Sequence, residues 1–132
     1  MKKTGVLHPE LNKLITEMGH TDELVVTDAG LPLPEEVTTR VDLALVKDMV
    51  PFLTVLDNVL NELSIEKVIM AEEIREKSPE MHEEILKRLH GVEVEYVPHV
   101  DFKQRTKQAR GLVRSGEHTS FANVILVGGV VY

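Results

Sequence analysis

The chain has 132 residues, of which 42% are hydrophobic, enough to build one globular domain around a packed core. Its formal net charge of −7 argues against nucleic acid or an anionic membrane as a partner, because both attract cationic surfaces. It has no cysteine, which excludes disulfides, cysteine-ligated metals and a thiol nucleophile. The N-terminus lacks the apolar core of a signal peptide and no apolar run reaches the ~20 residues of a membrane span, so we expect a soluble cytoplasmic protein.

Apolar residues at helical spacing predict four helices in chain order. These cover residues 9–18, 52–63, 79–89 and 102–109. Gly19 follows the first helix at a position where a left-handed C-cap is expected. Ser78 and Pro79 give the third helix an N-cap residue and a proline in its first turn.

Short buried or alternating runs predict six strands between and after these helices. They cover residues 24–27, 41–45, 67–71, 92–97, 111–113 and 122–127. Strands that alternate with helices in this way indicate βαβ units. We therefore predict a single α/β domain over residues 1–132, with a largely parallel sheet covered on both faces.

Three predicted strands end in ionisable residues, namely Asp28, Glu72–Glu73 and His99. Ligands of parallel sheets bind outside the carboxyl ends of the strands, so we expect a site at the edge that these residues share. His20 precedes a strand and would lie at the opposite edge. Only a loop that folds back, or another subunit, could then bring it to the site.

His20 and Asp28 flank the apolar run 24–27, in the segments Gly19-His20-Thr21-Asp22 and Asp28-Ala29-Gly30-Leu31-Pro32. An imidazole and a carboxylate on one short rigid element suit a reaction that only moves protons. Each residue also has a structural interpretation. His20 could place a favourable charge at a helix C-terminus, and Asp28 could form an Asx-turn.

A metal site would draw on His20, Asp22, Asp28 and His99, which are acceptable ligands of zinc or manganese. The chain has no His-x-x-x-His pair of the kind that metal sites place on a helix. We therefore expect no metal.

Four cations recur at helix-like spacing, at Lys103, Lys107, Arg110 and Arg114. They could form an anion or phosphate site, but charge runs of this kind are typical of a solvated helix face, which we favour. The chain has neither a Gly-x-x-x-x-Gly-Lys-Ser/Thr loop nor a Gly-x-Gly-x-x-Gly motif, so nucleotide binding has no support.

A polar loop over residues 114–123 leads to Asn123, at the mouth of an apolar strand. An amide in that position can both donate to and accept from a sugar hydroxyl. The alternative is a loop that only connects two strands.

Taken in order, these segments resemble the D-ribose pyranase and fucose mutarotase family along nearly the whole chain. The pieces that carry the resemblance are Gly19-His20-Thr21-Asp22, Asp28-Ala29-Gly30-Leu31-Pro32, Val41-Asp42-Leu43, Glu66-Lys67-Val68, Ala71-Glu72-Glu73-Ile74, His99, Phe102-Lys103, Arg114-Ser115-Gly116-Glu117 and Ala122-Asn123. The Asp-Ala-Gly-Leu-Pro segment is most similar to the ribose branch.

The resemblance implies a three-layer α/β/α fold with a mixed, mostly parallel sheet and no cofactor. It also implies a homo-oligomer, a decamer of two pentameric rings, with the sugar bound between neighbouring subunits. By the same resemblance, His20 is the proton donor. The implied sugar contacts are Asp28, His99, Lys103, Phe121, Ala122 and Asn123.

The activity implied is the interconversion of β-D-ribopyranose and β-D-ribofuranose by acid/base opening of the hemiacetal ring, as part of ribose catabolism. The chain departs from the family at Ser120-Phe121, where Pro-Tyr is usual, and at Ser115, where Thr is usual. Without the phenol hydroxyl, Phe121 offers only stacking against a sugar face. Two alternatives remain: a non-catalytic sugar-binding or regulatory module linked to ribose uptake, and an isomerase of sugar phosphates that uses Lys103, Lys107 and Arg110.

Overall fold

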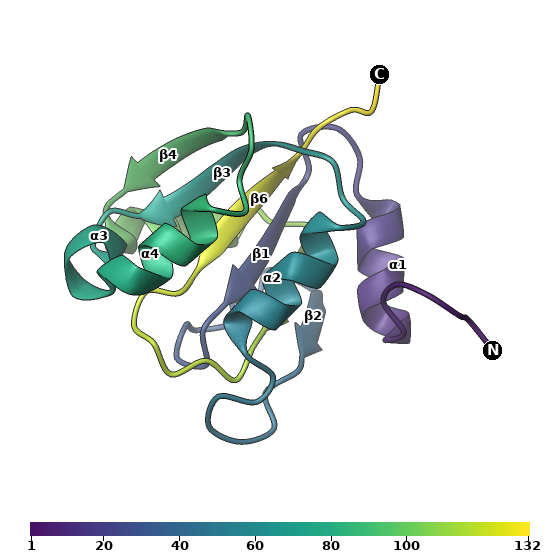
Figure 1. Cartoon of the computed structure of the whole chain (residues 1–132), viewed down its shortest axis with the longest axis horizontal. Coiled ribbons are helices and arrows are strands. Elements are labelled where there is room, and N and C mark those ends of the chain that lie inside the picture. The colour runs from purple at the N-terminus through teal and green to yellow at the C-terminus, as the bar shows by residue number, and fades with distance from the viewer.

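A six-stranded sheet in the order β2-β5-β1-β6-β3-β4 forms the middle layer of the computed structural model, which describes residues 1–132 (Figure 1). The strands are β1 (Glu23–Thr27), β2 (Thr39–Asp42), β3 (Ile65–Ala71), β4 (Glu93–Val97), β5 (Gly111–Arg114) and β6 (Val124–Gly128). Only β6 runs antiparallel to its neighbours, β1 and β3. The mixed, mostly parallel sheet is confirmed.

Helices cover both faces of this sheet. They are α1 (Pro9–Glu17), α2 (Phe52–Leu60), α3 (Ile74–Lys77), α4 (Pro79–Leu86) and α5 (His99–Thr106). Figure 1 shows α2 and α4 lying across one face of the sheet. No helix has both the length and the apolar character needed to span a bilayer.

Two separate clusters of buried residues fill the spaces between the layers, as the period-two alternation of strands requires. In β1, Leu24 and Val26 belong to the cluster beneath α1, α2 and α4, whereas Val25 belongs to the cluster beneath α5. All five residues of β1 are buried, and so are all five of β6, because these central strands are covered on both faces. The three-layer α/β/α fold is confirmed.

Some predicted boundaries were wrong. Leu43 and Leu45 lie beyond the end of β2, and the side chain of Leu45 is 80% exposed. The fourth predicted helix begins three residues earlier, at His99, and ends at Thr106. Residues 74–77 form a short helix, α3, that the sequence did not indicate.

Gly19 is not a left-handed C-cap. The chain leaves α1 in an extended conformation at Met18, and the positive φ of this turn, 68°, belongs to Thr21. Close packing requires a glycine at position 128, which faces this turn. A Cβ on Gly128 would lie 2.6 Å from the carbonyl oxygen of Gly19.

The four cations at helix-like spacing do not share a helix face. Because α5 ends at Thr106, Lys107 caps its C-terminus, Arg110 precedes β5 and Arg114 is the last residue of β5. Only Lys103 projects from the helix itself. The expected solvated helix face is therefore wrong, and the four side chains point from different parts of the fold.

Candidate functional site

Asp28, Glu73 and His99 lie at one edge of the sheet, as expected for residues that follow parallel strands. Because β6 is antiparallel, its first residues lie at the same edge, and this brings Asn123 beside Asp28. Four segments that are far apart in sequence thus meet at the carboxyl ends of β1, β3 and β4.

The Asp28 carboxylate is fixed on both of its oxygens. Oδ1 accepts hydrogen bonds from the amides of Gly30 (2.9 Å) and Leu31 (2.8 Å), which confirms the Asx-turn interpretation. Oδ2 accepts from Nδ2 of Asn123 (3.1 Å), while Oδ1 of Asn123 accepts from the Asp28 amide (2.9 Å). Asn123 is fully buried, so it anchors the carboxylate from within the core.

A pocket of about 430 Å³ opens in front of this carboxylate. Its size is within the range of small-molecule sites. It is lined by Asp28, Gly30, Leu31, Pro32, His99, Lys103, Ser120 and Phe121. Four of the predicted site residues therefore face one volume: a carboxylate, an imidazole, an ammonium group and a phenyl ring.

His99 is held as the first residue of α5, where its amide donates to both carboxylate oxygens of Glu73 (3.0 and 3.1 Å). Its ring lies near Phe102 in a stacked arrangement (6.3 Å between centroids) and meets Phe121 edge-on (5.0 Å). Burial lowers the pKa of His99 below its usual 6.5, and the nearby Lys103 ammonium lowers it further, against the opposing pull of Glu73 and Asp28. The imidazole is therefore neutral at physiological pH.

Nδ1 of His99 is the one buried side-chain nitrogen or oxygen without a hydrogen-bond partner. Such a group is costly unless a ligand or water pairs with it.

Phe121 and Ala122 play different structural parts. Phe121 adopts a left-handed backbone conformation (φ 62°), which turns its ring toward His99 and the pocket. Ala122 is fully buried in the core. Its side chain is therefore not available to a ligand in the pocket.

A second hollow of about 380 Å³ adjoins the first across the Asp28–Gly30 loop. No sequence pattern indicates the contacts that build this side. The carbonyl oxygen of Glu117 accepts from the Ala29 amide (2.8 Å), and its side chain accepts from the Phe52 amide (3.1 Å). Arg114 donates through Nε to the Ala29 carbonyl oxygen (3.1 Å). These contacts fix the loop that carries Asp28.

His20 lies at the other end of the sheet, before β1, and does not meet Asp28 within one chain. The five residues of β1 alone span about 16 Å. The loop before β1 does not fold back either, because the Thr21 amide donates to the carbonyl oxygen of Gly128 at that same end (2.9 Å). The opposite-edge expectation is therefore confirmed.

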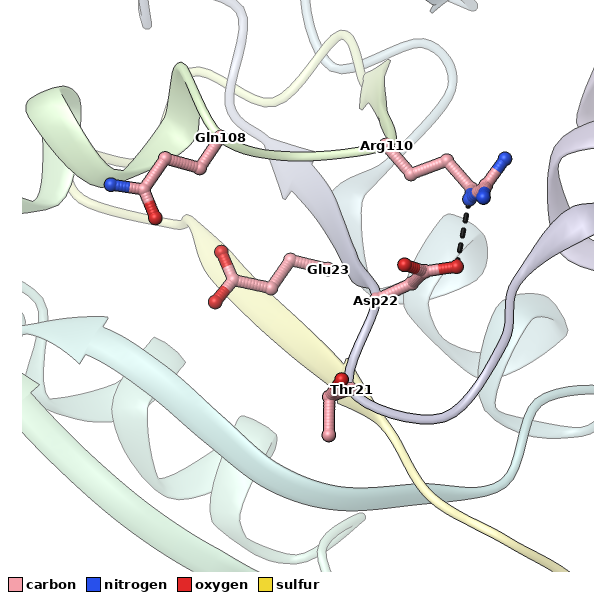
Figure 2. A pocket seen from close by; sticks show the side chains of 5 residues that line it. All are labelled: Thr21, Asp22, Glu23, Gln108 and Arg110. Atoms are coloured by element: carbon pink, nitrogen blue, oxygen red, sulfur yellow. Dashed lines mark hydrogen bonds and ion pairs between the residues drawn. The ribbon is translucent and has the colours of Figure 1, made fainter.

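The turn that carries His20 is locked by Asp22. Oδ2 of Asp22 accepts from the Gly19 amide (2.8 Å) and from Nε of Arg110 (2.8 Å). Figure 2 shows the contact between Asp22 and Arg110. The Gly19 hydrogen bond is the main reason that the pKa of Asp22 is lowered, with Arg110 acting in the same direction. A polar hollow of about 450 Å³ adjoins this turn and is lined by Thr21, Asp22, Glu23, Gln108 and Arg110 (Figure 2).

The residues considered as metal ligands do not converge. His20 and Asp22 lie at one end of β1 and Asp28 and His99 at the other. No group of three or more His, Asp or Glu side chains is arranged to hold a metal ion.

Comparison with known proteins gives consistent matches over the whole chain. The sequence model of the RbsD / FucU transport protein family matches residues 1–131. A D-ribose pyranase of Geobacillus kaustophilus is 51% identical over 132 residues, which cover 100% of this chain and 96% of that protein. A D-ribose pyranase of Escherichia coli is 43% identical, with full coverage of both chains.

Solved structures show the same fold. RbsD of Bacillus subtilis, determined in complex with D-ribose, superimposes with a TM-score of 0.95 at 39% identity and covers both chains completely. The fucose mutarotase of Streptococcus pneumoniae, determined with L-fucose, has a TM-score of 0.76 at 26% identity, covering 96% of this chain and 95% of that one.

Replacing Asn123 with Ala is expected to lower the free energy of unfolding by about 3 kcal/mol, because it leaves a cavity and removes two hydrogen bonds to Asp28. Urea unfolding measures the loss. Asn58→Ala is the control, since that exposed amide bonds only to the Thr54 carbonyl oxygen on α2 and should cost less than about 1 kcal/mol. Equal losses in the two variants would contradict the anchoring role of Asn123.

Replacing His99 with Gln is expected to change how stability depends on pH. Because the pKa of His99 is lower in the folded than in the unfolded chain, the unfolded state binds a proton first as pH falls below 6.5, and the folded state loses stability. The variant lacks this contribution. The free energy of unfolding of the wild type should thus fall, relative to that of the variant, from neutral to mildly acidic pH. A difference that stays constant or moves the other way would refute the assignment.

Proposed function

This chain belongs to the RbsD / FucU family, and from that premise we propose that it is a D-ribose pyranase, which interconverts β-D-ribopyranose and β-D-ribofuranose. The observation that carries the proposal is the pocket at the carboxyl ends of β1 and β4. There a fixed carboxylate, a neutral imidazole, an ammonium group and a phenyl ring line one volume.

These groups match the surface of a monosaccharide. The Asp28 carboxylate and the His99 imidazole can pair with hydroxyl groups, and Lys103 can donate to a sugar oxygen. The Phe121 ring can stack against the carbon–hydrogen face of the sugar. The structure of the Bacillus subtilis relative was determined in complex with D-ribose, which supports a monosaccharide as the ligand.

The reaction requires only the movement of protons, the breaking of one C–O bond and the formation of another. The ring oxygen takes a proton as its bond to C1 breaks, and the C1 hydroxyl gives up a proton to leave an open-chain aldehyde. After a bond rotates, a different hydroxyl group attacks C1 and loses its proton, while the carbonyl oxygen regains one. An acid and a base in fixed positions therefore suffice, each contributing on the order of 10²–10⁴-fold.

We assign the acid to His20, because an imidazole both donates and recovers a proton near neutral pH. Since His20 and Asp28 flank β1, His20 must reach the sugar from a second copy of the chain. The site is then shared by neighbouring subunits, in line with the ring assembly that the family resemblance implies, a decamer of two pentamers.

Exposed apolar side chains at the two ends of the sheet support such an association. The loop after β2 exposes Leu45 (80%), Val46 and Met49 at the Asp28 edge, and the tail after β6 exposes Val131 and Tyr132 at the His20 edge. Figure 1 shows this loop and the C-terminus at opposite ends of the molecule. Two different patches of this kind suit a head-to-tail contact, the type of contact from which rings are built.

A sugar-phosphate isomerase receives little support from this geometry. Of the three cations such an enzyme would use, only Lys103 lines the pocket. Arg110 lies at the opposite edge and is paired with Asp22.

Replacing His20 with Ala is expected to lower the ribose exchange rate, measured by saturation-difference NMR, by about 100-fold or more. Because His20 is exposed, stability should change little. His90→Ala, at an exposed histidine without side-chain partners, is the control and should keep the wild-type rate.

Calorimetry on the same variants separates the enzyme from a sugar-binding module. The proposal expects His20→Ala to bind ribose still but to catalyse poorly. Ribose binding by the wild type without any acceleration of exchange would favour the module and refute the enzyme.

A further inference from the structure

Only one interaction holds the His20 ring. Nε2 of His20 lies 3.0 Å from Oε2 of Glu66, and no other protein group hydrogen bonds to the ring. The backbone of the turn is fixed by Asp22, Arg110 and Gly128, as described above, but none of these contacts reaches the imidazole. Glu66 is therefore the one protein group that is placed to orient the imidazole.

Glu66 lies at an irregularity in the pairing of β3 with β6, and this position allows its contact with His20. Ile65 pairs with Gly128 and Lys67 with Val127, so Glu66 has no partner position in β6. Irregularities of this kind re-aim a side chain. Gly129 leaves the space that Glu66 needs, since a Cβ there would lie 3.2 Å from the Glu66 amide nitrogen.

Glu66 also has no competing partner. The neighbouring cation, Lys67, pairs with Glu95 (2.6 Å) and more distantly with Glu93 (3.9 Å). The Glu66 carboxylate is therefore free to accept from His20 alone.

We infer that Glu66 is a positioning residue that holds Nε2–H of His20, so that Nδ1 is the nitrogen that exchanges a proton with the sugar. The inference rests on the proposed function of His20. An ionised carboxylate can only accept a hydrogen bond, so the ring nitrogen that faces Glu66 must carry a proton. This fixes the neutral ring as the Nε2–H tautomer. In the imidazolium both nitrogens carry protons, Glu66 retains the one on Nε2, and the one on Nδ1 moves to the ring oxygen as the C1–O bond breaks. Reclosure returns a proton to Nδ1.

The spectroscopic test uses ¹⁵N-labelled histidine in the full-length protein, at a pH where the ring is neutral. The nitrogen chemical shifts of His20 distinguish the two tautomers. The wild type is expected to show the Nε2–H form, Glu66→Ala a mixture with the Nδ1–H form, and Glu66→Gln, whose amide oxygen still accepts, mainly the Nε2–H form. Glu93→Ala is the matched control, because it removes a carboxylate from the same sheet edge without touching His20. An unchanged tautomer in Glu66→Ala would overturn the inference.

The kinetic test compares exchange rates at saturating and at low ribose. Glu66→Ala is expected to lower the saturated rate about tenfold, with little change in the half-saturating ribose concentration. Glu66→Gln should recover most of this loss, and Glu93→Ala should match the wild type. A wild-type rate in Glu66→Ala would overturn the inference and leave the proposed function intact, provided that His20→Ala is inactive. A wild-type rate in His20→Ala would overturn both.

Discussion

A buried strand of five residues separates the two groups on which the proposed chemistry depends. Because β1 is covered on both faces and paired on both sides, it cannot bend to bring His20 toward Asp28. Each end of the strand is also fixed separately, by the Asp22 turn before it and by the Asn123 contact after it. Neither group can leave its edge of the sheet, and a site that uses both must be built from two chains.

The antiparallel strand β6 links these two edges. It begins beside Asp28, where Asn123 anchors the carboxylate, and it ends beside the His20 turn, where Gly128 accepts from the Thr21 amide. Its apolar tail then continues outward from the His20 edge. One strand therefore supports both parts of the proposed site, the pocket at one edge and the His20 turn at the other.

Much of this arrangement could be predicted from sequence, because it depends on local patterns. Apolar periodicity located most helices and strands, and parallel topology placed Asp28 and His99 at one edge. The contacts of Asn123, Glu66 and Glu73 could not be predicted. Each is a single side chain whose partner is distant in sequence, and no local pattern marks a lone carboxylate or amide. The prediction of a solvated helix face was wrong although it came from a local pattern. The helical spacing of the four cations continues past Thr106, where the helix itself ends.

Subunit mixing tests the shared site most directly. His20→Ala and Asp28→Asn chains are each expected to be inactive alone, and they are unfolded together, mixed in equal amounts and reassembled. If each site takes His20 from one chain and Asp28 from another, random assembly restores both residues in about a quarter of the sites, and ribose exchange returns to that fraction of the wild-type rate. A mixture that remains as inactive as its components would show that both residues must come from one chain, and would contradict the account.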